Sequence, residues 1–343
     1  MPILSSAGKG FRVQGEQATA PWQRAMKNAI RDPRELCRAL KLPADCEEGA
    51  VTAGRLFSVF APRGYVARMR PGDPFDPLLR QVLPLGMEAS EQPGFVPDPV
   101  GDAAAARTPG LLQKYSGRVL MITTGACAVH CRYCFRRHFP YLDTPKSLGE
   151  WEPAIEQIEA DPTIHEVLLS GGDPFTLIDE TLAALAERLS AIPHLRRLRV
   201  HTRLPIVIPQ RVNHDLIAWL TGSRLTPIVV VHANHPAELG GDVDEALSRL
   251  VDAGIGMFNQ AVLLRGVNDR IEVLTELCEH LADLRVWPYY LHQLDRVAGA
   301  AHFEVPEETG RRLIAELQDR LPGYAVPRYV RETPGAPHKV VLA

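Results

Sequence analysis

The stretch GACAVHCRYCFRRHF, residues 125–139, contains three cysteines in a C-x3-C-x2-C spacing. Cys127, Cys131 and Cys134 are close enough in sequence for one short loop to present three thiolates to a single iron–sulfur cluster. Such clusters normally take four protein thiolates. The other cysteines lie far away along the chain, at Cys37, Cys46 and Cys278. One iron should therefore be open to a substrate or cosubstrate, since a catalytic metal site keeps an open position.

Two other interpretations of the three cysteines remain at this point. A zinc site would need a fourth Cys or His at close spacing, and His130 and His138 are near enough in sequence to supply it. Alternatively, the three could be buried and act as small hydrophobic side chains. We expect only such a packing role for Cys37, Cys46 and Cys278, which fall in helical segments.

The composition is that of an ordinary globular protein. The 343 residues are 45% hydrophobic and 23% charged, which suits one large domain or one domain with a smaller companion. A net charge of −3 argues against a general nucleic-acid or membrane binder. We find no signal peptide and no apolar run long enough to span a bilayer. Six cysteines without secretory features favour a reducing, cytoplasmic location.

Changes in composition and periodicity along the sequence predict four segments. Residues 1–20 lack periodicity and are expected to form a loose arm. Residues 21–110 combine helical patterns with proline- and glycine-rich loops, and we expect an N-terminal helical and loop subdomain. Residues 111–330 alternate between apolar strands and amphipathic helices, and residues 331–343 form a short C-terminal segment that contains Lys339.

The strand and helix alternation predicts an α/β fold. The strand candidates are Arg118–Thr124, Glu166–Ser170, Leu198–Thr202, Pro227–His232, Met257–Leu264 and Arg285–His292. The helix candidates are Glu150–Glu159, Glu180–Ile192, Val243–Ala253, Ile271–Leu284 and Pro306–Leu321. Because short apolar strands that alternate with helices form parallel sheets covered by helices, we predict a partial (β/α)6 barrel of the TIM type rather than an open doubly wound sheet.

In such barrels the chemistry lies at the carboxyl ends of the strands. Polar residues follow the predicted strands, end one of them (His232) or lie within one (Gln260). They are the cysteine loop, Gly171-Gly172-Asp173, Arg203, His232, Gln260 and Asp295. The sequence therefore predicts that these residues line one mouth, although we assign no role to Arg203.

The cysteine spacing, with the aromatic Tyr133 immediately before the last cysteine, resembles the radical S-adenosylmethionine superfamily. The resemblance implies a [4Fe–4S] cluster on Cys127, Cys131 and Cys134, whose open iron chelates the amino and carboxylate groups of the methionine part of S-adenosylmethionine. It also implies the fold predicted above.

Three further positions correspond to cosubstrate contacts in that superfamily. Gly171-Gly172-Asp173 matches the segment that holds the methionine amino group, and two residues without side chains let a backbone approach a ligand closely. As an isolated tripeptide it would be an ordinary strand-to-helix turn. His232 and Gln260 resemble residues beside the adenosyl group, although a histidine at a strand end is also common in a core.

The C-terminal run ETPGAPHKVVL, residues 332–342, resembles the pyridoxal-phosphate lysine region of the lysine 2,3-aminomutase family. There, a glycine-rich turn precedes the lysine that forms a Schiff base with the cofactor, which identifies Lys339 as that lysine. An apolar flank helps such an amine to lose its proton. Ala336, Pro337 and His338 interrupt the family's glycine run. The resemblance extends from about Asp76 to the last residues, through QKYSGRVLMITTGAC, LLSGGDP, NQAVLLRGVND and PYYLHQLD.

The same resemblance suggests how substrate and cofactor are held. Arg136 corresponds to the arginine that pairs with the substrate carboxylate, which suits a guanidinium. Asp295 and Glu332 correspond to two acids that hold the ε-ammonium of lysine, with Glu332 in place of an aspartate. Tyr115 and Arg118 align with residues that contact the phosphate of the cofactor, or they could be polar residues at the start of a strand.

The implied reaction is an isomerisation that moves the α-amino group of free L-lysine from C2 to C3, giving β-lysine. In its run CRYCFRRHFPY and in ending four residues after Lys339, the chain resembles the shorter bacterial members of the family. The β-lysine of those members is used for post-translational modification of elongation factor P. We then expect an electron donor such as flavodoxin or ferredoxin, and a separate ligase that takes the product. The alternatives are the same chemistry on glutamate or arginine, or a non-catalytic Fe–S or zinc module.

Overall fold

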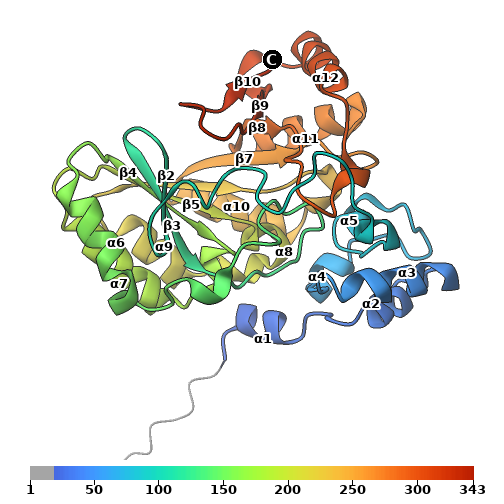
Figure 1. Ribbon diagram of the computed structural model, residues 1–343, viewed down its shortest axis with the longest axis horizontal. Helices are drawn as coiled ribbons and strands as arrows, with labels where there is room; N and C mark the ends of the chain where they lie inside the picture. The colour runs from blue at the N-terminus through green and yellow to red at the C-terminus, as the bar shows by residue number, and fades with distance from the viewer. Residues whose placement is uncertain (1–18) are drawn as a thin grey trace, which may run out of the picture.

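The structure, a computed structural model, describes residues 19–343 (Figure 1). The loose arm predicted for residues 1–20 therefore lies almost wholly outside the described residues. No helix of the part described is long and apolar enough to cross a membrane. The division of the chain at residues 110 and 330 stays a prediction.

In the described part of the chain, ten strands form a single sheet in which hydrogen-bonded neighbours follow the order of the sequence, from β1 to β10. Strands β3 to β9 are parallel, and the outer pairs β1–β2, β2–β3 and β9–β10 are antiparallel. No pairing within residues 19–343 joins β1 to β10, so the barrel is partial. The strands are β1 (Ala106–Thr108), β2 (Leu111–Tyr115), β3 (Arg118–Thr124), β4 (Glu166–Gly171), β5 (Arg197–Thr202), β6 (Thr226–Val231), β7 (Gly256–Val262), β8 (Trp287–His292), β9 (Arg328–Arg331) and β10 (Val340–Val341).

The α/β fold is confirmed, and β3 to β8 are the six strands that the sequence predicts. A seventh parallel strand, β9, was not predicted, because only two apolar residues stand between its terminal Arg328 and Arg331, too few to display an alternation. The hairpin partner β2 was also missed. It turns into β3 through Gly117, whose φ of +77° favours glycine.

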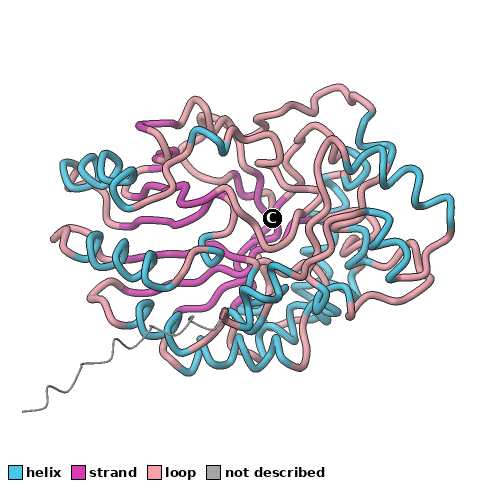
Figure 2. The backbone as a smooth tube through the Cα atoms, turned by 90° about the horizontal axis from the view of Figure 1, so that it is seen from below, coloured by secondary structure: helices cyan, strands magenta, loops and turns pink. Residues whose placement is uncertain are grey.

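Helices cover the outer face of the sheet, and the loops gather at one end of the strands (Figure 2). Each helix buries one apolar stripe, such as Leu182, Leu185 and Leu189 in α7. The longer of the two helices between β5 and β6, α9, has eight residues and was not predicted, since it follows a proline-rich stretch. The covering helices are α6 (Leu148–Ala160), α7 (Asp179–Ser190), α8 (Leu204–Val207), α9 (His214–Thr221), α10 (Asp242–Asp252), α11 (Ile271–Asp283) and α12 (Glu307–Arg320).

The N-terminal region contains five short helices that lie beside the loop end of the sheet (Figures 1 and 2). Asp76 caps α5 by accepting hydrogen bonds from two backbone N–H groups, and Pro33 starts α2, as prolines do in a first turn. The helices are α1 (Pro21–Lys27), α2 (Pro33–Ala39), α3 (Ala44–Gly54), α4 (Arg63–Val66) and α5 (Pro77–Arg80). The short 3-10 turns within residues 19–343 are η1 (Gly86–Ala89), η2 (Tyr141–Asp143), η3 (Pro174–Thr176), η4 (Pro209–Arg211), η5 (Pro236–Glu238), η6 (Ala301–Phe303) and η7 (Gly323–Ala325).

The hydrophobic core joins both regions. The largest buried cluster contains Leu36 and Leu79 from the N-terminal helices together with Val167 and Val229 from the sheet. Burial of this apolar area, at roughly 25 cal/mol per Å², fixes the N-terminal helices against the barrel. The cysteine loop is therefore held between two parts of one core.

Candidate active site

One cavity of about 800 Å³ lies inside the partial barrel, and its lining runs from the first residues of strands, such as Arg118 and Glu166, to the loops after their carboxyl ends. The strand register aims side chains into it: Leu120, Leu168, Arg199 and Ile228 are successive partners on β3 to β6, and all line the cavity. Every residue that the sequence analysis proposed for the site also lines it. These residues are Tyr115, Arg118, Cys127, Cys131, Cys134, Arg136, Gly171, Gly172, Asp173, His232, Gln260, Asp295, Glu332 and Lys339.

The N-terminal region holds the cysteine loop in place. The backbone N–H of Arg132 donates to the carbonyl of Gln81 at 2.9 Å, and that of His130 donates to Phe60 at 3.0 Å. Glu88, fully buried in η1, pairs with Arg132 at 2.5 Å and with Arg137 at 2.8 Å. Removal of one partner of such a buried pair costs about 3–5 kcal/mol, so Glu88 fastens the loop on both sides of Cys134.

The three cysteines of the loop all line the cavity. Burial raises the pKa of Cys134 to about 11 and that of Cys127 well above its usual value, so metal binding must supply the energy to remove these protons. A zinc ion would need side chains that converge on one point. Within residues 19–343 no group of three or more His, Cys, Asp or Glu side chains converges in this way. Cluster cysteines each bind a different iron, so they do not converge on one point as zinc ligands do.

Gly171 and Gly172 bring the end of β4 against the cysteine loop. The N–H of Gly172 donates to the carbonyl of Thr124 at 2.7 Å. A Cβ atom at Gly172 would lie 2.2 Å from the carbonyl oxygen of Ala126, and one at Gly171 would lie 2.6 Å from that of Thr124. Only glycine fits this approach. The pair thus packs on the protein's own loop, and its contact with a cosubstrate stays a prediction.

The side chain of Asp173 has a structural role, because it links two strand ends by hydrogen bonds. Its carboxylate accepts hydrogen bonds from the Thr202 hydroxyl at 2.7 Å and from the backbone N–H groups of Phe175, Arg203 and Leu204 at 3.1, 2.6 and 3.1 Å. With four donors on two oxygens, this carboxylate ties the end of β4 to the end of β5. A direct ligand contact of Asp173 would therefore involve its backbone.

Lys339 and Glu332, from the C-terminal part of the chain, form an ion pair in the lining of the cavity. Tyr115 donates from its hydroxyl to Glu332 Oε1 at 2.6 Å, and the Arg118 guanidinium lies 4.6 Å from the centre of the Tyr115 ring. Burial opposes ionisation of Glu332, but Lys339 and the hydrogen bonds from Lys339 and Tyr115 outweigh it and lower its pKa. The predicted phosphate contacts of Tyr115 and Arg118 stay predictions, and Tyr115 has this further partner.

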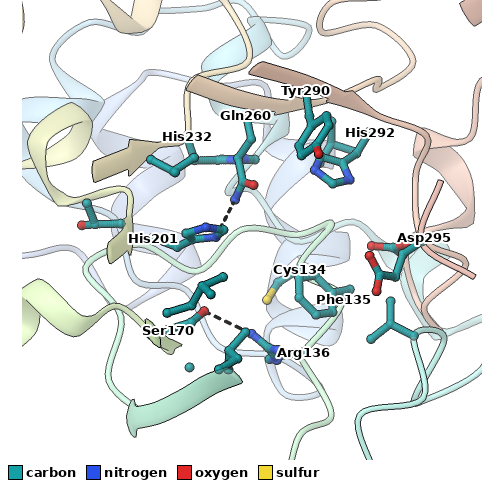
Figure 3. Close-up of a pocket in the computed structure, with 18 of the residues that line it drawn as sticks. Cys134, Phe135, Arg136, Ser170, His201, His232, Gln260, Tyr290, His292 and Asp295 are labelled. Carbon is teal, nitrogen blue, oxygen red and sulfur yellow. Dashed lines mark hydrogen bonds between the residues drawn. The ribbon is translucent and has the colours of Figure 1, made fainter. Parts of the chain in front are cut away.

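Asp295 has the opposite electrostatic character. Burial raises the pKa of its carboxyl group to about 7, and the negative charge of Glu332 also raises it, while Lys339 lowers it. Asp295 therefore holds its proton easily until a cation approaches. Figure 3 shows Asp295 on a different part of the cavity wall from Arg136.

Arg136 is oriented by a residue that the sequence analysis missed. Its Nε donates to Asp102 Oδ2 at 2.7 Å, and its Nη1 donates to the Ser170 hydroxyl at 3.3 Å (Figure 3). Asp102 Oδ1 lies 2.7 Å from Lys114 Nζ, which is itself 3.8 Å from Glu332. A chain of alternating charges thus connects the two ends of the cavity. No sequence signal pointed to Asp102, which lies in a loop rich in proline and glycine.

Three half-buried histidines also line the cavity. His232 Nε2 lies 2.8 Å from the Tyr133 hydroxyl, and burial lowers its pKa to about 3. Burial likewise lowers the pKa values of His201 and His292 well below the usual range, so all three are neutral at pH 7. Gln260 Nε2 lies 3.4 Å from His201 Nδ1 (Figure 3). His201 and His292 were missed, although strand alternation places them on the same face as Arg199 and Tyr290.

Asp102→Asn should weaken the site at its Arg136 end. Charge-assisted hydrogen bonds contribute about 1.5–3 kcal/mol, so we expect KM for the amino-acid substrate to rise by roughly 10- to 100-fold with a smaller change in kcat. Steady-state kinetics on cofactor-loaded protein measures this split. The exposed Asp143→Asn serves as the control. An unchanged KM with Asp102→Asn would show that Asp102 does not orient Arg136.

Comparison with known proteins defines the class of this site. Residues 121–218 match the sequence profile of the Radical SAM superfamily. An L-lysine 2,3-aminomutase of Haemophilus influenzae is 42% identical over 322 residues, which cover 94% of this chain and 95% of the relative. The L-lysine 2,3-aminomutase of Escherichia coli is 43% identical over 324 residues, with 94% of each chain covered. That of Clostridium subterminale is 35% identical over 92% of this chain and 76% of its own length.

The chain therefore belongs to the L-lysine 2,3-aminomutase family of radical SAM isomerases. The family resemblance that the sequence predicted is confirmed. The roles of individual residues in binding stay predictions, and the geometry above is what supports them.

Proposed function

We propose that this protein is a lysine 2,3-aminomutase, which moves the α-amino group of free L-lysine from C2 to C3. One observation carries the proposal: the three cysteines and Lys339, which lie more than 200 positions apart in sequence, face the same cavity, whose lining includes the guanidinium of Arg136 and the carboxyl groups of Asp295 and Glu332. An α-amino acid with a distal cation fits this charge pattern.

The residues of the cavity fit the cofactors of such an enzyme. Cys127, Cys131 and Cys134 would hold the [4Fe–4S] cluster and leave one iron for S-adenosylmethionine, and Lys339 Nζ would bind pyridoxal phosphate. Cluster and S-adenosylmethionine together supply radical chemistry, and pyridoxal phosphate supplies a conjugated system that stabilises unpaired spin next to nitrogen.

The side chains of the cavity would bind and orient the substrate and shield it from water. Arg136 would hold the substrate carboxylate, with its guanidinium fixed by Asp102. Asp295 and Glu332 would hold the ε-ammonium, since a desolvated cation needs compensating charge. Neutral His201 and His232 add no positive charge to the cavity wall, and the N-terminal region would help to keep water from the cavity.

The wider setting is also part of the proposal. A low-potential electron donor such as flavodoxin or ferredoxin would reduce the cluster, and the β-lysine would pass to a ligase that modifies elongation factor P. Reaction on a free amino acid needs no direct contact with elongation factor P. We place the enzyme in the cytoplasm, where thiols stay reduced.

The decisive assay is an anaerobic reaction of the reconstituted protein with dithionite, S-adenosylmethionine and one amino acid at a time. Separation of α and β isomers by mass-resolved chromatography should show β-lysine from L-lysine. Glutamate offers no distal cation to Asp295 and Glu332, and arginine is longer than lysine, so both should react far more slowly. Conversion of glutamate at the rate of lysine, or no conversion of any of the three by protein loaded with all cofactors, would contradict the proposal.

The raised pKa of Asp295 predicts a pH dependence. Below pH 7 its carboxyl group is neutral, whereas the ε-ammonium of lysine keeps its charge up to about pH 10. We expect kcat/KM for lysine to rise about tenfold per pH unit below 7 and to level off above it. Asp295→Asn should remove this dependence and lower the plateau. A wild-type profile that is flat from pH 6 to 8 would contradict the assignment.

A further inference from the structure

Arg203 makes a direct contact with one of the three clustered cysteines. Its Nη1 donates a hydrogen bond to the sulfur of Cys131 at 2.8 Å, across 72 positions of sequence. Cys131 is half-buried and lines the cavity, and the Arg203 side chain is 6% exposed. Neither the motif of residues 125–139 nor the sequence analysis gave Arg203 a role.

The guanidinium is fixed from its other side. Nη2 of Arg203 pairs with Glu238 at 2.7 Å and donates to the side-chain oxygen of Gln81 at 2.7 Å, and Glu238 is fully buried. Glu238 in turn accepts from Gln81 Nε2 at 3.0 Å and from the backbone of Asn234 at 2.9 Å. Three separate segments of the chain thus aim one cation at one sulfur.

The backbone of Arg203 is held equally firmly. Its N–H donates to Asp173 at 2.6 Å, the same carboxylate that braces the end of β4. The neighbouring Arg132, although adjacent to Cys131 in sequence, is turned away and pairs with Glu88. The contact with sulfur is therefore a specific feature of Arg203 and not a consequence of general positive charge around the loop.

Hydrogen bonds and charge near cluster sulfurs set the reduction potential of an iron–sulfur cluster. Reduction adds one electron, which a low-potential one-electron donor loses, and no proton is taken up at Cys131. The added negative charge is shared with the thiolates. A cation that donates to one of them stabilises the reduced cluster more than the oxidised one, so the potential rises.

We infer that Arg203 is a positioning residue that orients the Cys131 thiolate and raises the reduction potential of the cluster, which brings the cluster within reach of its electron donor. The inference rests on the proposed function, since it requires the cluster. It adds a role for the Arg203–Glu238–Gln81 network, which explains why a polar network is built into the core beneath the cysteine loop.

The test is an anaerobic reductive titration of reconstituted protein, followed by the electron-spin signal of the reduced cluster. Arg203→Gln alone would leave Glu238 buried without its partner, so the main variant is the double substitution Arg203→Gln with Glu238→Gln. We expect its potential to fall by an amount that corresponds to at least a tenfold loss in the reduction equilibrium, which is about 59 mV for one electron. Arg203→Lys, which keeps a charge for Glu238 but cannot span both partners, should show a smaller fall.

A matched control is available in the same fold. Arg211 is fully buried and pairs with Asp179 at 2.7 Å, and its other hydrogen bonds go to the carbonyls of Phe175 and Leu177. Arg211→Gln with Asp179→Asn removes a buried ion pair of the same kind, and it should leave the potential unchanged.

Each outcome bears on the inference. Equal potentials in wild type, the Arg203 variants and the control would overturn it. Loss of cluster loading in the folded Arg203 double variant, but not in the control, would support the positioning role, and Arg203→Lys carries the test if the double variant does not fold. A wild-type protein that takes up no cluster would refute the proposed function, which is a distinguishable result.

Discussion

Lys339→Arg is expected to abolish binding of pyridoxal phosphate and to lower activity by on the order of 10³-fold or more. Arginine keeps a positive charge beside Glu332, so the ion pair that holds the C-terminal segment survives. Its guanidinium stays protonated and cannot act as the nucleophile that binds the cofactor. The visible absorbance of protein-bound pyridoxal phosphate should disappear, while iron and acid-labile sulfide stay at the wild-type content.

The exposed Lys146→Arg is the matched control, and it should retain both the cofactor and the activity. The ion pair between Lys339 and Glu332 also suggests how the substrate ammonium is accommodated. When Lys339 binds the cofactor, Glu332 loses its closest cation, and a substrate ammonium can take that place beside Asp295. Retention of the pyridoxal phosphate absorbance by Lys339→Arg would show that another lysine binds the cofactor.

The parts of the fold that the sequence predicted are those with a local signal. Strands β3 to β8 were predictable because each is a run of apolar residues followed by an amphipathic helix. The cysteine loop was predictable because its three ligands lie within eight positions, from Cys127 to Cys134. Such patterns depend on neighbours in sequence and need no knowledge of the tertiary fold.

The missed features depend on contacts between distant segments. Asp102 reaches Arg136 across 34 positions, and Glu88 reaches Arg132 across 44. Both carboxylates come from loops or single turns of the N-terminal region, whose local sequence is typical of exposed chain. Only the packing of that region on the barrel buries them, and burial is what turns an ordinary surface charge into an orienting group.

Substitution of the three motif cysteines is expected to have the second large effect on cluster content and activity. The six cysteines divide into these three and the three that lie outside the motif, which serve as controls. Serine at Cys127, Cys131 or Cys134 should reduce the iron and sulfide content severely and lower activity by on the order of 10³-fold or more, since a cluster with three protein ligands has no spare one. Metal and sulfide analysis after anaerobic reconstitution measures the first effect, and the β-lysine assay measures the second.

The other three cysteines are the controls. Cys37 and Cys278 are buried in α2 and α11, where burial raises their pKa values to about 11 and about 12, and Cys46 is half-buried in α3. Their substitution by alanine should cost only packing, of about 1 kcal/mol, and leave cluster content intact. A full cluster in the Cys134→Ser variant would mean that the loop does not supply three ligands, and it would reopen the zinc and packing interpretations of the motif.

The two substitutions act on opposite sides of one cavity, and this allows a stronger conclusion than either alone. Lys339→Arg should retain the cluster and lose pyridoxal phosphate, whereas Cys134→Ser should lose the cluster and retain pyridoxal phosphate. The two proposed sites lie in one cavity, but no side chain is proposed as a ligand in both. Loss of both cofactors in either variant would mean that the cavity forms only when both are bound. The cysteine loop has its own protein contacts, from Glu88 to Arg132 and Arg137 and from Arg203 to Cys131, and these argue for independent loading.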